Sequence, residues 1–188
     1  MSYMEPEQLT LYNMRLISGK SGSSVTRSCG ITYRSLRNWE TGVAVPNIVN
    51  VHDLLQIYGY SFYELDLAPF YEVQPYRAEK QKRIITAARK RTPVSNPPKS
   101  LSLHDMRKVS GYTGVTVSEI CEISYRSLLN WEKGSSIPNV VNINDLLDIY
   151  GYSFYELDLS TFHYAFKMRV RKQIESDPLA KSADNQLL

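Results

Sequence analysis

Residues 14–67 read MRLISGKSGSSVTRSCGITYRSLRNWETGVAVPNIVNVHDLLQIYGYSFYELDL, and this stretch decides the fold because it occurs twice. It returns 92 residues later, without an insertion or deletion, as MRKVSGYTGVTVSEICEISYRSLLNWEKGSSIPNVVNINDLLDIYGYSFYELDL. Between residues 9–70 and 101–162, 37 of 62 aligned positions are identical. The chain is therefore a tandem duplication, and a duplicated small unit usually carries two copies of one binding surface.

The length and composition fit two small globular domains joined by a linker. The chain has 188 residues, of which 43% are hydrophobic and 11% aromatic, so each copy can bury a small core but is too short for a large catalytic cleft. The expected division is a first domain, a linker, a second domain, an extension and a tail, at residues 9–69, 70–100, 101–161, 162–172 and 173–188. The sequence has no apolar run of about eighteen residues and no secretion signal, so we expect a cytoplasmic protein without membrane contact.

Positive charge is concentrated outside the two repeats. Residues 9–70 carry a net charge of +1 and residues 101–162 a net charge of −4, whereas residues 71–100 carry +6 and residues 163–188 carry +2. This distribution favours a polyanionic partner that contacts the linker as well as the domains, although a solvated spacer has the same composition.

Both copies contain the capping residues that are typical of short helices. A residue that can cap a helix N-terminus precedes each apolar segment, at Thr10, Ser21, Thr32, Asn47 and Ser61 and at the matching Ser102, Thr113, Ser124, Asn139 and Ser153. Ser61 and Glu64 form the S-x-x-E capping box of a fifth helix, FYELDL. In the third helix, Leu36 and Trp39 face the core. The predicted fold is mainly α, with five short helices in each domain.

Residues that carry catalysis or bind metals form no motif in this sequence. Cys29 and Cys121 occupy equivalent positions without a second cysteine or a histidine nearby, so we interpret them as small core residues. His52, His104 and His163 share no motif, and the carboxylates fit capping or surface roles better than an acid–base pair. We therefore expect a protein that is not an enzyme and binds no metal or cofactor.

The most specific signal surrounds the second and third helices. About four residues, 29–32, separate these helices, which is the geometry of a helix-turn-helix. Both copies resemble the Cro and CI repressor type of helix-turn-helix, often called the Xre family. In the first copy, the resemblance rests on Arg15, Ser21, Gly30, Trp39, Glu40, Gly42, Pro46, Gly59, Glu64 and Leu65, and the block W-E-x-G-x-x-x-P is its most specific part. The chain departs from the family at Gly22 and Gly114, where a polar residue is expected.

The resemblance implies one ion pair in each copy. The family places an arginine of the first helix against a glutamate near the end of the third. The matching residues are Arg15 with Glu40 and Arg107 with Glu132. A bidentate pair at this place fixes the angle between the two helices.

The third helix of a helix-turn-helix enters the DNA major groove with its N-terminus first, so exposed residues of its first two turns reach the base edges. The expected base-reading residues are Tyr33, Arg34, Arg37, Asn38, Tyr125, Arg126 and Asn130. Arginine pairs with guanine and asparagine with adenine, so Arg34 and Arg126 are the first candidates. Phosphate contacts are expected from Ser23, Ser24, Thr26, Thr32, Ser35, Thr116, Ser124 and Ser127. An ordinary solvated helix face has the same residue types.

Two nearly identical reading faces predict two similar half-sites on one DNA duplex. Their centres lie about ten base pairs apart if both units bind one face of the DNA. The sequence leaves open whether the half-sites are inverted or direct, and whether chains dimerise further. Leu129 stands where the first copy has Arg37, so we expect the first copy to bind more strongly.

The segments that follow each repeat show a strand pattern. Residues 162–170 alternate apolar and polar side chains, and residues 70–76 occupy the same register after the first repeat. This pattern predicts a small antiparallel β ribbon that joins the two domains about a pseudo-twofold axis as an internal dimer. Residues 77–91 are basic and predict a short helix, either for phosphate neutralisation or as a soluble spacer. Residues 173–188 are expected to form a disordered tail.

Together these features predict a protein that binds double-stranded DNA in a sequence-specific way, most simply a transcriptional repressor of a bacterium or mobile element. One alternative is an accessory protein that marks a plasmid origin for transfer or replication. Another is a protein-interaction adaptor in which one unit no longer binds DNA. Salt dependence separates the adaptor from the DNA-binding proteins, because phosphate binding weakens steeply with added salt.

Overall fold

The computed structural model describes residues 8–73, 80, 83, 84, 86 and 100–176. The described part of the chain is mainly helical and contains no β-strand, which confirms the predicted class. The first repeat forms α1 (Leu11–Ile17), α2 (Gly22–Cys29), α3 (Tyr33–Glu40), α4 (Ile48–Tyr58), the 3₁₀ turn η1 (Phe62–Glu64) and α5 (Ala68–Glu72). The second forms α7 (Leu103–Val109), α8 (Gly114–Ile120), α9 (Tyr125–Glu132), α10 (Val140–Tyr150), η2 (Phe154–Glu156) and α11 (Ser160–Ser176).

Side-chain caps start the first four helices of each repeat, as the sequence predicts. In each case the capping oxygen accepts a hydrogen bond from the backbone N–H of the third helical residue. Each cap satisfies a donor that the helix itself leaves free, so the boundaries follow from local chemistry. The caps are Thr10, Ser21, Thr32 and Asn47, with Ser102, Thr113, Ser124 and Asn139 in the second repeat.

The core of each repeat gathers around its fourth helix. α4 buries residues on nearly every side, because it packs against α2, α10 and α11. Its counterpart α10 also buries most of its residues and packs against α4. Leu36 of α3 and Leu128 of α9 are buried, and Trp39 and Trp131 pack half-buried against the core. The third helices therefore turn one apolar stripe inward and leave their other side to solvent.

The expected fifth helix is not a continuous helix. The capping box of Ser61 and Glu64 is present, but it closes only the short turn η1. The chain is then extended at Leu65, where the N–H of Leu9 donates to Glu64 O at 2.7 Å and the N–H of Asp66 donates to Leu9 O at 2.9 Å. These bonds tie the start of the repeat to its end, and Leu101 and Leu157 form the same parallel bridge in the second repeat.

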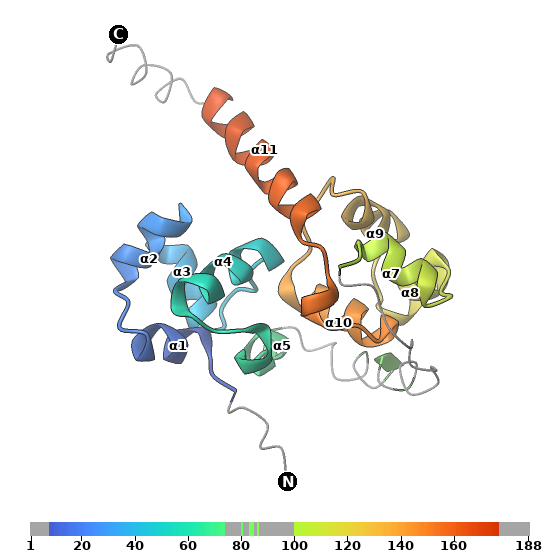
Figure 1. The fold of residues 1–188 in the computed structure, drawn as a ribbon, viewed down its shortest axis with the longest axis horizontal. Coiled ribbons are helices and arrows are strands. Elements are labelled where there is room, and N and C mark those ends of the chain that lie inside the picture. The colour runs from blue at the N-terminus through green and yellow to red at the C-terminus, as the bar shows by residue number, and fades with distance from the viewer. Residues whose placement is uncertain (1–7, 74–79, 81–82, 85, 87–99, 177–188) are drawn as a thin grey trace.

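The predicted β ribbon is wrong for the described residues. Residues 162–172 lie within α11, which also runs across the predicted boundary between extension and tail, and residues 70–72 lie in α5. Phe162 is buried and Phe166 packs against the core, so a helical spacing of four residues holds the apolar contacts. α11 projects away from the other helices in Figure 1. Residues 74–76 and 177–188 lie outside the described part of the chain.

The two repeats lie next to each other in Figure 1 and meet through reciprocal contacts. The N–H of Ile48 donates to Pro138 O at 3.1 Å, and the N–H of Val140 donates to Pro46 O at 3.0 Å. Between them, Asn47 and Asn139 form an antiparallel bridge. Val140 is the counterpart of Ile48, and Pro138 is the counterpart of Pro46, so the two hydrogen bonds are one contact with the roles of the repeats exchanged. Such reciprocal contacts are the signature of a twofold interface.

Aromatic residues extend this reciprocal contact. The rings of Phe62 and Phe154 are stacked with centroids 4.2 Å apart, and those of Tyr63 and Tyr155 lie 4.9 Å apart. Both pairs join residues 92 positions apart. The junction between the repeats is thus built from the starts of α4 and α10 and from η1 and η2, in place of the predicted ribbon.

Two residues of the basic segment, Lys80 and Arg83, contact the second repeat. Residues 80, 83, 84 and 86 have helical backbone, in line with the helix predicted over residues 77–91, whose other residues lie outside the described part. Ile84 is fully buried, and Lys80 is 5% exposed. Arg83 Nη1 lies 2.9 Å from Glu122 Oε1. The positive charges of Lys80 and Arg83 are therefore paired with carboxylates of the protein itself.

Candidate nucleic-acid interface

The outer face of α3 carries most of the expected base-reading residues of the first repeat. Tyr33 is 61% exposed, and Arg34 and Arg37 are exposed as well. Asn38 is half-buried, since the turn after α3 folds back and the N–H of Ala44 donates to Asn38 O at 3.1 Å. Two arginines and a tyrosine thus form a polar face on the first two turns of the helix.

The matching face of α9 differs in one position. Tyr125, 48% exposed, and Arg126 are accessible, and Asn130 is half-buried like Asn38. Leu129 is half-buried where the first repeat has an exposed arginine. The second face therefore offers one cation where the first offers two.

Tyrosine at the start of the third helix explains the glycine at the start of the second. A Cβ atom added to Gly22 lies 2.6 Å from Tyr33 Cε2, and one added to Gly114 lies 2.4 Å from Tyr125 Cε2. Real Cβ atoms do not approach another atom so closely, so the ring occupies the place of any larger side chain. Glycine and tyrosine thus form a matched pair in each repeat.

The expected phosphate-binding hydroxyls are not all equally available. Ser23 and Ser24 are exposed on the first turn of α2. Thr32 and Ser35 share a hydrogen bond of 2.8 Å, as Ser124 and Ser127 do at 2.7 Å. The half-buried Thr26 Oγ1 donates to Ser23 O at 3.1 Å, and the half-buried Thr116 is bonded to Thr113. Ser23, Ser24, Thr32 and Ser124 remain the best exposed of the set.

The structure contains the ion pair between α1 and α3. Arg15 Nε lies 2.5 Å from Glu40 Oε1, and Arg15 Nη2 donates to Glu40 Oε2 at 3.1 Å. A third donor, Arg15 Nη1, reaches Lys20 O at 3.2 Å in the turn before α2. The hydrogen bond to Glu40 raises the pKa of Arg15 above its ordinary value, against the opposing effect of burial. One guanidinium thus connects α1, the end of α3 and the turn before α2.

The second repeat has the same ion pair with an added histidine. Arg107 bonds both carboxylate oxygens of Glu132, at 2.5 and 2.9 Å, and also donates to Tyr112 O. His104 Nδ1 lies 3.0 Å from Glu132 Oε2. Burial acts to raise the pKa of Glu132, but the hydrogen bonds from Arg107 and His104 outweigh it, and the pKa is lowered. Glu132 is therefore held in its charged form.

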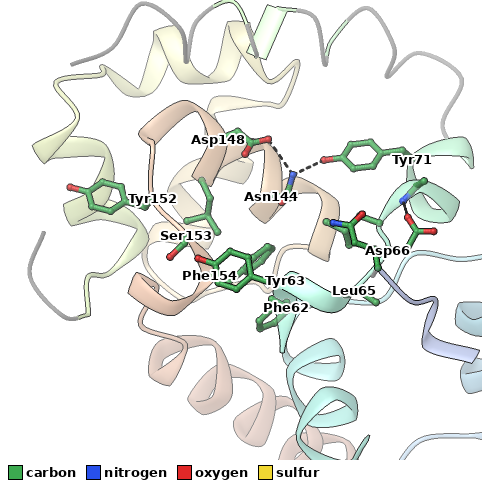
Figure 2. Close-up of a pocket in the computed structure, with 14 residues that line it drawn as sticks. Phe62, Tyr63, Leu65, Asp66, Tyr71, Asn144, Asp148, Tyr152, Ser153 and Phe154 are labelled. Carbon is green, nitrogen blue, oxygen red and sulfur yellow. Dashed lines mark hydrogen bonds between the residues drawn. The ribbon is translucent and has the colours of Figure 1, made fainter. Parts of the chain in front are cut away.

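A pocket of about 470 Å³ lies at the junction, lined by both repeats (Figure 2). Phe62 and Phe154 lie on one side of it, and Tyr71, Asn144 and Asp148 on the other. Asn144 Nδ2 donates to Tyr71 Oη at 3.0 Å and to Asp148 Oδ2 at 3.2 Å. Hydrogen bonds thus fasten α5 of the first repeat to α10 of the second.

A buried ion pair stands beside these bonds. Asp145 of α10 is 1% exposed, and its carboxylate accepts a hydrogen bond from Tyr71 Oη at 2.9 Å. Lys80 Nζ lies 2.7 Å from Asp145 Oδ2. The sequence pattern suggested a role for Lys80 towards DNA or solvent, whereas the structure uses its charge to neutralise a carboxylate of the second repeat.

Across the junction, the structure brings together two histidines that the sequence treats as unrelated. His52 and Asp53 lie on α4 and His163 on α11. The two imidazole rings meet edge to face with centroids 5.1 Å apart, and His52 Nδ1 lies 3.5 Å from Asp53 Oδ1. Because His52 and His163 are 111 positions apart, only the duplication, read together with a twofold junction, could have signalled this contact.

The two cysteines have different surroundings. Cys121 is buried as predicted, whereas Cys29 is half-buried. Burial raises the pKa of the Cys29 thiol to about 11, with a smaller contribution from Asp53. A thiol of this kind stays protonated at neutral pH and is a poor nucleophile.

Among the described residues, no helix combines the length and the apolar character needed to cross a membrane. Comparison with protein-family models, with curated proteins and with solved structures gives no match for this chain.

Proposed function

We propose that this protein binds double-stranded DNA in a sequence-specific way, with residues 9–69 and 101–161 acting as two helix-turn-helix domains of the Cro and CI type. In this proposal α2 with α3, and α8 with α9, are the helix-turn-helix pairs. The observation that carries it is the exposed Arg34 and Arg126, which stand at equivalent positions on the first turns of two short helices packed against a capped helix. A role as transcriptional repressor is the simplest use of such binding.

The reciprocal junction supports an inverted order of the two half-sites. Twofold contacts, such as Ile48 with Pro138 and Val140 with Pro46, present the two reading helices in opposite directions along a duplex. A direct repeat needs two units related by translation, and that relation does not produce reciprocal contacts. In this proposal the single chain binds DNA as a symmetric dimer does. The inverted order answers a question that the sequence alone leaves open.

The arginine–glutamate pairs support the rigid presentation that base reading requires. Arg15 and Arg107 each bond a glutamate at the end of the third helix and a backbone oxygen before the second. A side chain that reads a base must be held to within a fraction of an ångström, which a network of charged hydrogen bonds provides. In this role the pairs position Arg34 and Arg126 without touching DNA.

Electrostatics favour the first repeat as the stronger DNA-binding unit. Arg34 and Arg37 are both exposed on α3, whereas Arg126 stands beside half-buried Leu129 on α9. The second repeat is acidic, and Lys80 and Arg83 from the basic segment pair with its Asp145 and Glu122. We propose that these pairs reduce the repulsion between the second repeat and DNA phosphates.

The test is a binding measurement with paired variants. Arg34→Ala combined with Arg126→Ala removes the proposed guanine contacts, each worth about 1–3 kcal/mol of discrimination. The preferred sequence should lose its advantage over random DNA while weak binding remains. Lys108→Ala with Arg169→Ala removes the same charge from exposed positions on α7 and α11 and should retain the preference. Equal effects of the two double variants would contradict the assigned reading residues.

The binding activity is common to a repressor and to an accessory protein of plasmid transfer or replication. The position of the bound site separates the two roles, because a repressor occupies a promoter and an accessory protein occupies an origin. Footprinting on DNA from the neighbourhood of the coding sequence locates the site.

A further inference from the structure

The cluster of His52, Asp53 and His163 at the junction has the composition of a metal site. Candidate ligand atoms of the three side chains lie within 4.8 Å of one another, and all three residues are half-buried. They come from α4 of the first repeat and α11 of the second, two helices that pack against each other. An ion from solvent can therefore reach ligands held by both repeats.

We propose that His52, Asp53 and His163 bind a divalent first-row transition metal, with Zn²⁺ as the best-matched ion, which links the two repeats. Two imidazoles and one carboxylate are ligands that zinc prefers, and three protein ligands leave a fourth position for water. Bonds of about 2.0–2.2 Å place tetrahedral ligand atoms about 3.4 Å apart. The separation of 3.5 Å between His52 Nδ1 and Asp53 Oδ1 is close to this value, and the candidate ligand atom of His163 lies within 4.8 Å of both.

The pseudo-twofold counterpart of this cluster is occupied by a cation from the protein itself. Residues 92 positions away from His52 and Asp53 are Asn144 and Asp145, and the residue 92 positions before His163 is Tyr71. At that place Lys80 Nζ lies 2.7 Å from the carboxylate of Asp145, which also accepts a hydrogen bond from Tyr71. The same backbone positions thus hold a carboxylate beside a positive charge.

The histidine cluster keeps the carboxylate and replaces the other two residues. Asparagine and tyrosine in the counterpart give way to two histidines, the commonest metal-binding side chains. Two charged residues lie near the imidazoles in the described part of the chain. Asp53 Oδ1 lies 3.5 Å from His52 Nδ1, and the exposed Lys167 lies one turn beyond His163 on α11. A metal ion in this cluster supplies the charge that Lys80 supplies in its counterpart.

The experiment uses the full chain, freed of metal with a chelator, and no DNA, so that its outcome is independent of the proposed function. Zn²⁺ is titrated in competition with a chromophoric chelator, and Co²⁺ is added separately because tetrahedral Co²⁺ absorbs visible light. We expect one equivalent of tightly bound Zn²⁺ and a visible Co²⁺ spectrum. Zn²⁺ at a hundred times its Kd should also multiply the ratio of folded to unfolded protein about a hundredfold.

The chain offers matched variants for this test. His52→Asn and His163→Tyr each install the residue found at the counterpart position, so the fold already accommodates the new side chain. Each should abolish the one-equivalent binding and the metal-dependent rise in melting temperature. His104→Gln removes the remaining one of three histidines in the sequence, which lies beside Glu132, and should leave metal binding unchanged.

Three outcomes overturn the proposal. The first is wild-type protein that shows neither chelator-competing Zn²⁺ binding nor a Co²⁺ spectrum, a result that needs no variant. The second is binding that survives in both His52→Asn and His163→Tyr. The third is binding that is lost in His104→Gln, which would move the site to the second repeat.

Discussion

The ring of Phe62 stacks on the ring of Phe154, its own counterpart in the second repeat, with centroids 4.2 Å apart and planes inclined by 9°. A residue that packs on its own counterpart lies on or near a twofold axis. The stack therefore marks the axis that relates the two repeats. It also means that one duplicated residue type stabilises the junction from both sides.

Removal of this stack should loosen the junction more than the repeats. Phe62→Ala and Phe154→Ala should each lower the free energy of unfolding, and a double-mutant cycle should give a coupling of about 0.5–1.5 kcal/mol. Chemical denaturation of the four proteins measures this coupling. Val43→Ala, which shortens an exposed apolar side chain, is the control and should show no coupling with Phe154→Ala.

The same variants should separate half-site binding from binding of the complete site. Phe62→Ala should bind an isolated half-site as well as the wild type does, because the stack joins η1 to η2 whereas Arg34 lies on α3. It should bind the complete site more weakly, since the remaining junction contacts hold the two repeats less rigidly. Equal losses on both DNAs would show that the stack does not set the geometry of the reading helices.

Glu122 occupies a backbone conformation that favours glycine. Its φ is +51°, and it is the single non-glycine residue with positive φ among those described, whereas its counterpart Gly30 has φ of +63°. A left-handed conformation costs a residue with a Cβ about 1–2 kcal/mol. Glu122→Gly should therefore raise the free energy of unfolding, by less than this amount because the ion pair with Arg83 is lost.

The reverse exchange provides the check. Gly30→Glu should lower the free energy of unfolding by about 1–2 kcal/mol, although nothing lies within 4 Å of an added Cβ. Urea denaturation of both variants gives the two values. A stabilised Gly30→Glu protein would contradict the explanation from backbone conformation.

The pairing of glycine with tyrosine predicts an unusual response to alanine. Alanine has a higher helix propensity than glycine, yet Gly114→Ala should destabilise the protein because the new Cβ lies 2.4 Å from the ring of Tyr125. Adding Tyr125→Ala should remove the clash and restore the propensity gain. If Gly114→Ala alone stabilises the protein, as measured by its melting temperature, the ring does not exclude larger side chains.

The Glu132 carboxylate predicts a dependence of stability on pH. Its pKa is lowered in the folded protein, so its charge stabilises the fold fully above the unfolded-state value of about 4.3. This contribution is lost as the pH falls through the lower folded-state pKa. At pH 7, Glu132→Gln should cost about 3 kcal/mol because it leaves Arg107 without its counter-charge in a nearly buried place.

The difference in the free energy of unfolding between Glu132→Gln and wild type should narrow as the pH falls below 4. Denaturation curves at pH 7, 5 and about 3 follow the narrowing, since wild-type Glu132 loses its charge progressively as the pH falls through its lowered folded-state pKa. Glu119→Gln, at an exposed position on α8, is the control. A constant difference between Glu132→Gln and wild type at every pH would show that the carboxylate charge does not stabilise the fold.

Local chemistry made much of the fold predictable from sequence. Capping residues such as Thr32 and Asn47 satisfy backbone donors within their own helix, so their signal needs no tertiary context. The pseudo-twofold relation was predicted from a β ribbon, whereas the described residues form it through the starts of α4 and α10 and through η1 and η2. The predicted ribbon failed because alternation at residues 162–170 also fits a helix in which Phe162 and Phe166 pack on one side, and only the packing decides between the two periods.

Contacts across the junction were beyond sequence reasoning for a different reason. The sequence alone predicts that Lys80 is a solvated basic residue, whereas the fold places its side chain beside buried Asp145. His52 and His163 have no common motif, and their approach depends on how α11 packs against α4. In both cases the partner lies far away in the sequence, so no local pattern records the pair.

Two similar reading helices related by a twofold axis are central to the proposed function, and selection from random double-stranded DNA tests this arrangement most directly. The purified full chain should enrich an inverted repeat of two similar half-sites, with centres about ten base pairs apart. Arg34→Ala with Arg126→Ala should enrich none. Failure of the wild-type chain to enrich any sequence, or its enrichment of a direct repeat, would contradict the account.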